Sequence, residues 1–143
     1  MINSAPSVWN VDVTVLSRPK KGQTRKIGRQ PLIDLGAVQA AIAGKLLIDD
    51  DVWLATPRCR SRLEDYEWTY ADVLKMFSCL RAEDYKESEW CDVDGGRTVP
   101  ADVYRIAYDD KRRERSRNGL VFYVKFSIDD AGGLTLVLVQ CHL

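Results

Sequence analysis

The spacing of apolar residues changes at Pro100, and this change constrains the fold of the 143-residue chain more than any other feature. Before Pro100, apolar residues recur at the three- and four-residue spacing of helices. After Pro100, three segments alternate apolar and polar residues as strands do, namely 102–108, 120–128 and 134–143. We therefore predict an α+β domain, with helices from the N-terminal half packed on a C-terminal antiparallel β-sheet whose central strand is 120–128.

Three capping residues predict where the helices begin. Asp34 precedes a segment with helical spacing that Gly44 ends. Thr56 precedes Pro57, a residue favoured in the first turn of a helix. Thr69 precedes a third helix with apolar residues at positions 73, 74, 76, 77 and 80. We expect the next residues, 82–90, to continue this helix or to form a short helix of their own.

The N-terminal residues 1–31 read as an extension to a core of residues 32–143, within a single domain of residues 1–143. Residues 8–16 alternate apolar and polar side chains, and this pattern predicts a strand. Residues 18–31 carry basic side chains interrupted by Gly and Pro, and this composition predicts a loop.

The alternation also assigns side chains to the two faces of the predicted sheet. On 120–128, Phe122 and its even-numbered neighbours point towards the core, while Tyr123 and Lys125 point to the opposite, polar face. Gln140 and His142 share one face of the last strand. Whether that face is also the face of Tyr123 depends on the hairpin register, because a slip of one residue moves His142 to the other side.

Composition excludes several classes of protein. The 21 Lys and Arg residues balance the 21 Asp and Glu residues, so net charge does not indicate a polyanion partner. No stretch of the sequence is apolar over enough residues for a membrane span, and the first residues lack the pattern of a signal peptide. We therefore expect a cytoplasmic protein with no membrane partner. The spacing of the four cysteines fits no zinc site, so we expect reduced thiols, no metal and no cofactor.

Basic residues nonetheless cluster at 18–29, 58–62 and 111–117. Such clusters are either solvated loops or the lining of a groove that binds an anion such as RNA.

Several short sequences occur in a familiar order: LGAVQAAIAGK, TPRCRSRL, YADVLKMFSCLRAEDYKES, ADVYRI and YVKFSI, followed by a final strand. From Leu35 to the C-terminus, this order resembles the motility quorum-sensing regulator toxins (MqsR family), small bacterial RNases of type II toxin–antitoxin pairs. The resemblance implies a RelE-like fold that cleaves mRNA without a metal and leaves 2′,3′-cyclic phosphate and 5′-hydroxyl ends. It also implies a cognate antitoxin protein as partner.

The resemblance implies catalytic roles for three residues, and Arg105 is a fourth catalytic candidate. Tyr123 matches the family tyrosine that opens the penultimate strand, and His142 stands where the family has a lysine that closes the last strand. Lys86 lies one position before the family lysine that follows the third helix. The family glutamine before D-V-Y is replaced by Ala101. The candidates for the missing positive charge are Arg105, Arg97 and the residues of the 111–117 loop.

Further basic residues are candidates for binding RNA: Lys111, Arg112, Arg113, Arg115, Lys125 and Arg97. For the four residues of the 111–117 cluster, the scarcity of apolar neighbours predicts a contribution to RNA affinity rather than to stability.

Two other functions fit the same sequence. The altered family positions favour a catalytically degenerate MqsR-like fold that binds protein or nucleic acid, such as a protein encoded by a phage or mobile element. The basic clusters alone favour a nucleic-acid binder that does not cleave.

Overall fold

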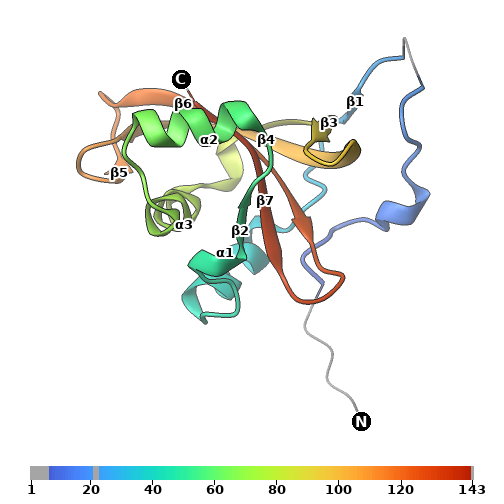
Figure 1. The fold of residues 1–143 in the computed structure, drawn as a ribbon, viewed down its shortest axis with the longest axis horizontal. Coiled ribbons are helices and arrows are strands. Elements are labelled where there is room, and N and C mark those ends of the chain that lie inside the picture. Colours follow the sequence, from blue (N-terminus) through green and yellow to red (C-terminus); the bar gives the residue numbers. More distant parts are fainter. Residues whose placement is uncertain (1–6, 21–22, 143) are drawn as a thin grey trace.

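The computed structural model describes residues 7–20 and 23–142, which form an α+β fold (Figure 1). Positions 21 and 22 of the predicted basic loop and position 143 of the last predicted strand lie outside the described residues. The helices are α1 (Leu35–Ala43), α2 (Pro57–Asp65) and α3 (Tyr70–Cys79). The strands are β1 (Lys26–Gly28), β2 (Val52–Leu54), β3 (Tyr85–Val93), β4 (Arg97–Asp109), β5 (Glu114–Arg115), β6 (Leu120–Asp129) and β7 (Thr135–His142).

All three predicted helix starts are confirmed. The side chains of Asp34, Thr56 and Thr69 each accept a hydrogen bond from a backbone N–H in the first turn of α1, α2 and α3. These bonds satisfy donors that have no partner within the helix. Gly44 follows the last residue of α1, as the sequence predicts.

Two of the predicted elements are wrong. Residues 8–16 form no regular strand, because Asp12 accepts hydrogen bonds from the backbone and hydroxyl of Thr14 and bends the chain into a 3-10 turn at Val13–Val15. Residues 82–84 form a short 3-10 helix, but residues 85–90, also predicted as helix, belong to β3, which pairs with β4 from Tyr85 to Val93 with a shift at Lys86. Pairing with a distant strand overrides the local helical spacing there. The predicted loop 18–31 also contains the short strand β1.

The sheet has the order β1-β3-β4-β6-β7-β2, with β5 paired to β4 outside this path. The prediction of antiparallel strands over the last third of the chain, with β6 between β4 and β7, is confirmed. The sheet extends beyond that prediction, because β3 and β1 continue it on one side. On the other side, β2 adds a strand parallel to β7.

Three helices cover one face of the sheet. Figure 1 shows α2 and α3 to the left of β4 and β7, and the segment that leads to β1 to the right. Phe122, Val124 and Phe126 of β6 are fully buried in the core between the sheet and the helices. The same core includes Leu63 of α2 and Phe77 of α3. Burial of this apolar surface is the main contribution to folding.

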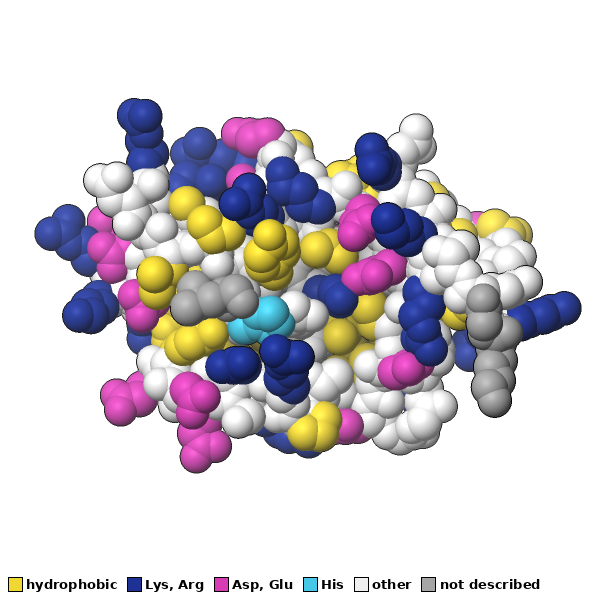
Figure 2. Space-filling model, turned by 90° about the horizontal axis from the view of Figure 1, so that it is seen from above, with side chains coloured by type: hydrophobic (Ala, Val, Ile, Leu, Met, Phe, Trp, Pro, Cys, Tyr) yellow, Lys and Arg dark blue, Asp and Glu magenta, His cyan; other side chains and the backbone are white. Residues whose placement is uncertain are grey.

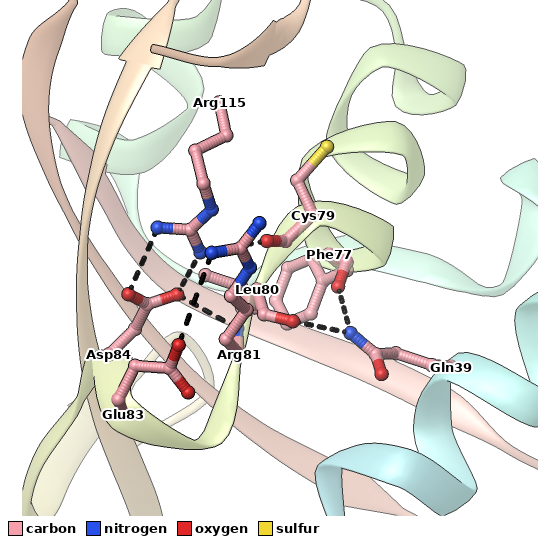
Figure 3. A network of polar contacts seen from close by, with 8 residues as sticks. All are labelled: Gln39, Phe77, Cys79, Leu80, Arg81, Glu83, Asp84 and Arg115. Atoms are coloured by element: carbon pink, nitrogen blue, oxygen red, sulfur yellow. Dashed lines mark hydrogen bonds and ion pairs between the residues drawn. The ribbon is translucent and has the colours of Figure 1, made fainter. Parts of the chain in front are cut away.

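A polar network closes the end of α3 (Figure 3). The Gln39 amide, from α1, donates to the carbonyls of Phe77 and Leu80 at 3.0 and 2.8 Å. Arg115, from β5, donates to the Cys79 carbonyl at 2.9 Å and forms an ion pair with Asp84. These side chains satisfy carbonyls that a helix end leaves without partners, and they hold α1, α3 and β5 together.

A second buried polar group attaches the N-terminal segment to the sheet. Asp102 of β4 is fully buried and accepts hydrogen bonds from the backbone N–H groups of Leu32 and Ile33 at 3.1 and 3.0 Å. The Ser88 hydroxyl donates to the same carboxylate at 2.6 Å. Burial raises the pKa of Asp102, although these three hydrogen bonds act in the opposite direction.

The sheet curls so that β2 approaches β3. In the sheet order, β4, β6 and β7 separate these two strands. The Asp94 N–H, directly after β3, nevertheless donates to the Ala55 carbonyl, directly after β2, at 2.8 Å. Arg60 of α2 adds an ion pair to Asp94 at 2.6 Å. Side chains from β3, β4 and β7 pack with Ala55 on the face that the helices leave uncovered, so this face is the inside of the curl, and we call it the concave face.

Small apolar side chains fill part of the concave face. They come from β3, β4, β7 and the residue after β2, and they form a second buried cluster: Ala55, Cys91, Val93, Val99, Ala101, Val137 and Val139. The polar side chains of the concave face lie beyond this cluster, towards the start of β6 and the end of β7.

Candidate active site on the concave face

The two faces of β6 are those that the sequence predicts. Its buried aromatic side chains point towards the helices, while Tyr123 and Lys125 point to the concave face. Tyr123 is 41% exposed, so its phenol is accessible from outside the molecule. Leu120 is an exception to the prediction, because this first residue of β6 is exposed rather than buried.

The register of the β6–β7 hairpin places His142 directly opposite Tyr123. From Asp129↔Thr135 to Phe126↔Leu138 the pairing is regular, and it then shifts by one residue, so that Lys125 pairs with Gln140. Val139 is the extra residue of this β-bulge. Without it, His142 would face the helices. The bulge therefore answers the question of register that the sequence leaves open.

The Thr56 hydroxyl holds this bulge at the start of α2. It donates to the Val139 carbonyl at 3.0 Å and accepts from the Cys59 N–H at 3.1 Å. One side chain thus caps the helix and satisfies the carbonyl of the extra residue. The start of α2 is thereby attached to the part of β7 that carries Gln140 and His142.

Three catalytic candidates form a row across the sheet. Arg105 of β4 pairs with Tyr123 of β6, which pairs with His142 of β7. Side chains directly opposite in neighbouring strands have their Cβ atoms about 5 Å apart. The guanidinium carbon of Arg105 lies 6.0 Å from the centre of the Tyr123 ring. The row therefore brings a cation, a phenol and an imidazole to one exposed surface.

A small pocket of about 190 Å³ adjoins the row at His142. It is lined by Thr56, Arg58, Cys59, Val139, Gln140 and His142. The Gln140 amide nitrogen contacts the His142 Nε2. Burial raises the pKa of the Cys59 thiol to about 12, so this sulfur is protonated at neutral pH and is a poor nucleophile. Arg58 is exposed and adds a second positive charge near the imidazole.

Figure 2 shows this face, with the single histidine of the chain in cyan. Lys and Arg side chains lie on more than one side of it, and Asp and Glu side chains lie among them. Glu89 of β3 is an acidic residue of the concave face, because it forms an ion pair with the Lys125 ammonium at 2.6 Å. Lys125, predicted to bind RNA, therefore already has a carboxylate partner.

Lys86 is the catalytic candidate that the structure leaves outside the row. It is exposed and lies at an irregularity of β3, where pairing with β4 shifts between Tyr85 and Glu87. Two steps in the sheet order separate β3 from β6, the strand of Tyr123. Arg97 lies farther away, at the start of β4, and its guanidinium carbon is 5.9 Å from the centre of the Trp53 ring.

The basic cluster 111–117 divides into two kinds of side chain. Lys111 and Arg112 are exposed. Arg113 forms an ion pair with Asp72 at 3.3 Å and lies 5.0 Å from the centre of the Trp68 ring. Arg115 caps α3 as described above (Figure 3). The structure thus contradicts the expectation that this whole cluster is unimportant for stability.

Three further residues contribute to the site, Gln140, Arg58 and Thr56, and the sequence does not predict this contribution. From the sequence, Thr56 is only a helix cap and Arg58 only part of a basic cluster. Only Gln140 carried a signal, because it shares a strand face with His142. The proximity of α2 to β7 is a tertiary contact that no local pattern encodes.

Among residues 7–20 and 23–142, no group of three or more His, Cys, Asp or Glu side chains is arranged to hold a metal ion. Within the same residues, no helix is long and apolar enough to cross a membrane. Comparisons of the chain with protein-family models, with curated proteins and with solved structures find no match.

Proposed function

We propose that the protein is a metal-independent endoribonuclease that cleaves mRNA in the cytoplasm and is controlled by an antitoxin protein. The observation that carries the proposal is the Arg105–Tyr123–His142 row on the concave face. The proposal of an antitoxin partner is based only on the resemblance to the MqsR family.

The row contains the groups that such a reaction requires. The ribose 2′-oxygen attacks the phosphorus atom, and the bond from phosphorus to the 5′-oxygen breaks. His142 accepts the 2′-hydroxyl proton, because imidazole is the side chain suited to proton transfer near neutral pH. The Tyr123 hydroxyl donates a proton to the departing 5′-oxygen. Arg105 stabilises the negative charge that develops on the phosphoryl oxygens. The products are a 2′,3′-cyclic phosphate and a 5′-hydroxyl end.

The test is cleavage of RNA by the purified protein in EDTA, followed by analysis of the new ends. We expect cyclic phosphate ends and a rate that falls by about 10²- to 10⁴-fold in His142→Ala, the usual effect of removing a general acid or base. Tyr123→Phe should also slow cleavage. Tyr70→Phe is the matched control, because Tyr70 is similarly exposed, at 46%, but lies at the start of α3.

Thermal unfolding of each variant separates loss of chemistry from loss of fold. Cleavage by His142→Ala at the parental rate, with the fold intact, would falsify the catalytic assignment.

A second candidate function is RNA binding without cleavage. The observation that favours it is the placement of the lysines, because Lys86 stays outside the row and Lys125 is paired with Glu89. On this alternative the parental protein binds RNA in EDTA, and its affinity falls with rising salt, but no new ends form.

A further inference from the structure

A cavity of about 380 Å³ lies at the other end of the sheet, between the N-terminal segment and the strands. This volume is in the range of small-molecule sites in proteins, about 300–1,000 Å³. Its outer wall comes from the N-terminal segment, and its inner wall comes from β3, β4, β6 and β7 with the turn that follows β6. The lining residues that bear on its chemistry are Trp9, Arg18, Trp90, Arg97, Asp129 and Asp130.

Hydrogen bonds attach the N-terminal segment to the rest of the fold on both sides of this wall. Towards β1, the Trp90 N–H donates to the Arg25 carbonyl at 2.8 Å. The Asn10 N–H donates to the Leu32 carbonyl and the Asp34 N–H donates to the Val8 carbonyl, at 2.8 and 2.6 Å. The 3-10 turn Val13–Val15 that follows has no buried residue. This turn therefore contributes little to the core, while Val13 faces the cavity.

The lining has three chemical parts. The first is aromatic and apolar, and includes the indoles of Trp9 and Trp90. The second is cationic and consists of the exposed Arg18 and Arg97. The third, Asp129 with its neighbour Asp130, is acidic. A ligand that matches all three parts has a planar ring, a negative group and hydrogen-bond donors on the ring.

We propose that this cavity binds a nucleotide whose base carries an exocyclic amino group. The indoles stack on or against the base, the two arginines bind the phosphate, and the aspartates accept hydrogen bonds from the amino group. The ligand is a free nucleotide or a nucleotide within RNA, since both present the same groups. The site is separate from the row: Ser127 and Tyr123 lie on β6 four residues apart, a distance of about 13 Å.

The experiment is a calorimetric titration of the full-length protein with GMP, AMP, CMP and UMP, and with inorganic phosphate. We expect the three nucleotides with an amino group to bind at least about tenfold more tightly than UMP and phosphate, the difference that one charge-assisted hydrogen bond provides. Equal affinity for all four nucleotides, or no binding by any, would overturn the proposal.

Variants locate the binding. Arg97→Ala should weaken binding by about tenfold or more and, because Arg97 is exposed, should remain folded. Arg81→Ala is the matched control, since Arg81 is an exposed arginine that follows α3 and does not line the cavity. Trp9→Ala tests stacking, and Asp129→Asn should reduce the preference over UMP. Unchanged affinity in Arg97→Ala and Arg18→Ala would show that the nucleotide binds elsewhere and would refute the site.

A short single-stranded RNA containing one of the three bases distinguishes the two sources. Competition with the mononucleotide identifies the cavity as a subsite for RNA, and binding of the mononucleotide without competition identifies it as a site for a free nucleotide. The nucleotide titration is independent of the cleavage assay. In His142→Ala, cleavage should be lost while nucleotide affinity is retained, so either proposal can fail without the other.

Discussion

The two faces of the sheet carry different chemistry although the same strands form both. On the covered face, polar groups such as Asp102 and the Arg115–Asp84 pair are buried and have partners that join separate segments. On the concave face, Arg105 and Tyr123 are exposed and lie in a row with His142. The covered face thus uses polar side chains to hold the fold. The polar side chains of the concave face are accessible to a ligand.

The largest expected difference in stability is between variants of two adjacent residues of β6. Phe122→Ala should lower the free energy of unfolding by about 3–5 kcal/mol, because it leaves a cavity in the covered core. Tyr123→Ala should lower it by less than about 1 kcal/mol, since Tyr123 is 41% exposed. Urea unfolding of both variants measures the difference. Similar losses in the two would contradict the division between the faces.

Asp102 should have the next largest effect. Asp102→Ala leaves the backbone donors of Leu32 and Ile33 without their acceptor, which should cost about 3 kcal/mol. Asp92→Ala is the control, because Asp92 is exposed and its ion pair with Arg25 at 2.9 Å lies at the surface. We expect the control to change stability by less than about 1 kcal/mol.

The raised pKa of Asp102 also predicts a dependence on pH. The folded state binds the proton more tightly than the unfolded state does. The contribution of this group to stability is therefore greatest at acidic pH, below its ordinary pKa of 3.8, and falls as the pH rises through the raised pKa. The difference in stability between the parent and Asp102→Asn should thus shrink as the pH rises across this window. A constant difference would show that Asp102 does not titrate as its burial predicts.

The smallest expected difference in stability is between variants of two arginines of the basic cluster 111–117. Arg115→Ala should lower the free energy of unfolding by about 2 kcal/mol, because it leaves Asp84 buried without its cation and the Cys79 carbonyl without its donor. Arg112→Ala should change it by less than about 0.5 kcal/mol, since Arg112 is exposed. Equal values, measured by thermal or urea unfolding, would assign both residues to the solvated surface.

The salt dependence of RNA affinity is a second measurement that distinguishes Arg112 from Arg115. Arg112→Ala should reduce the salt dependence of RNA affinity by a slope of about 0.7 if it contacts one phosphate of a single strand. Arg115→Ala should leave that slope unchanged in its folded population, because its guanidinium is bound to Asp84 and Cys79.

Local signals explain what could be predicted of the fold. A helix cap acts within three residues, so Asp34, Thr56 and Thr69 identify the helix starts without reference to the rest of the chain. Alternation along β6 likewise identifies its two faces. The same reasoning failed at residues 8–16 and 85–90. Pairing with β4 decided the structure of residues 85–90, and the hydrogen bonds between Asp12 and Thr14 decided the bend within residues 8–16.

The candidate site was predictable in part for the same reason. The resemblance to the MqsR family implies the roles of Tyr123, His142 and Lys86, and Arg105 is one candidate for the missing positive charge. Strand alternation adds the face on which Tyr123 lies. Whether these side chains lie close together depends on the register of β4, β6 and β7, which local sequence patterns do not determine. The structure brings three of them into one row and leaves Lys86 outside it.

By itself, the sequence determined the helix starts, the α+β class and the two faces of β6, because these follow from hydrogen bonds and side-chain periodicity within a few residues. Only the tertiary structure decided that His142 faces Tyr123, because one extra residue in β7 shifts the register and Thr56 of a distant segment satisfies its carbonyl. It also decided that Arg113 and Arg115 stabilise the fold while Arg112 stays exposed. These outcomes depend on partners far away in the sequence, and local composition contains no information about such partners.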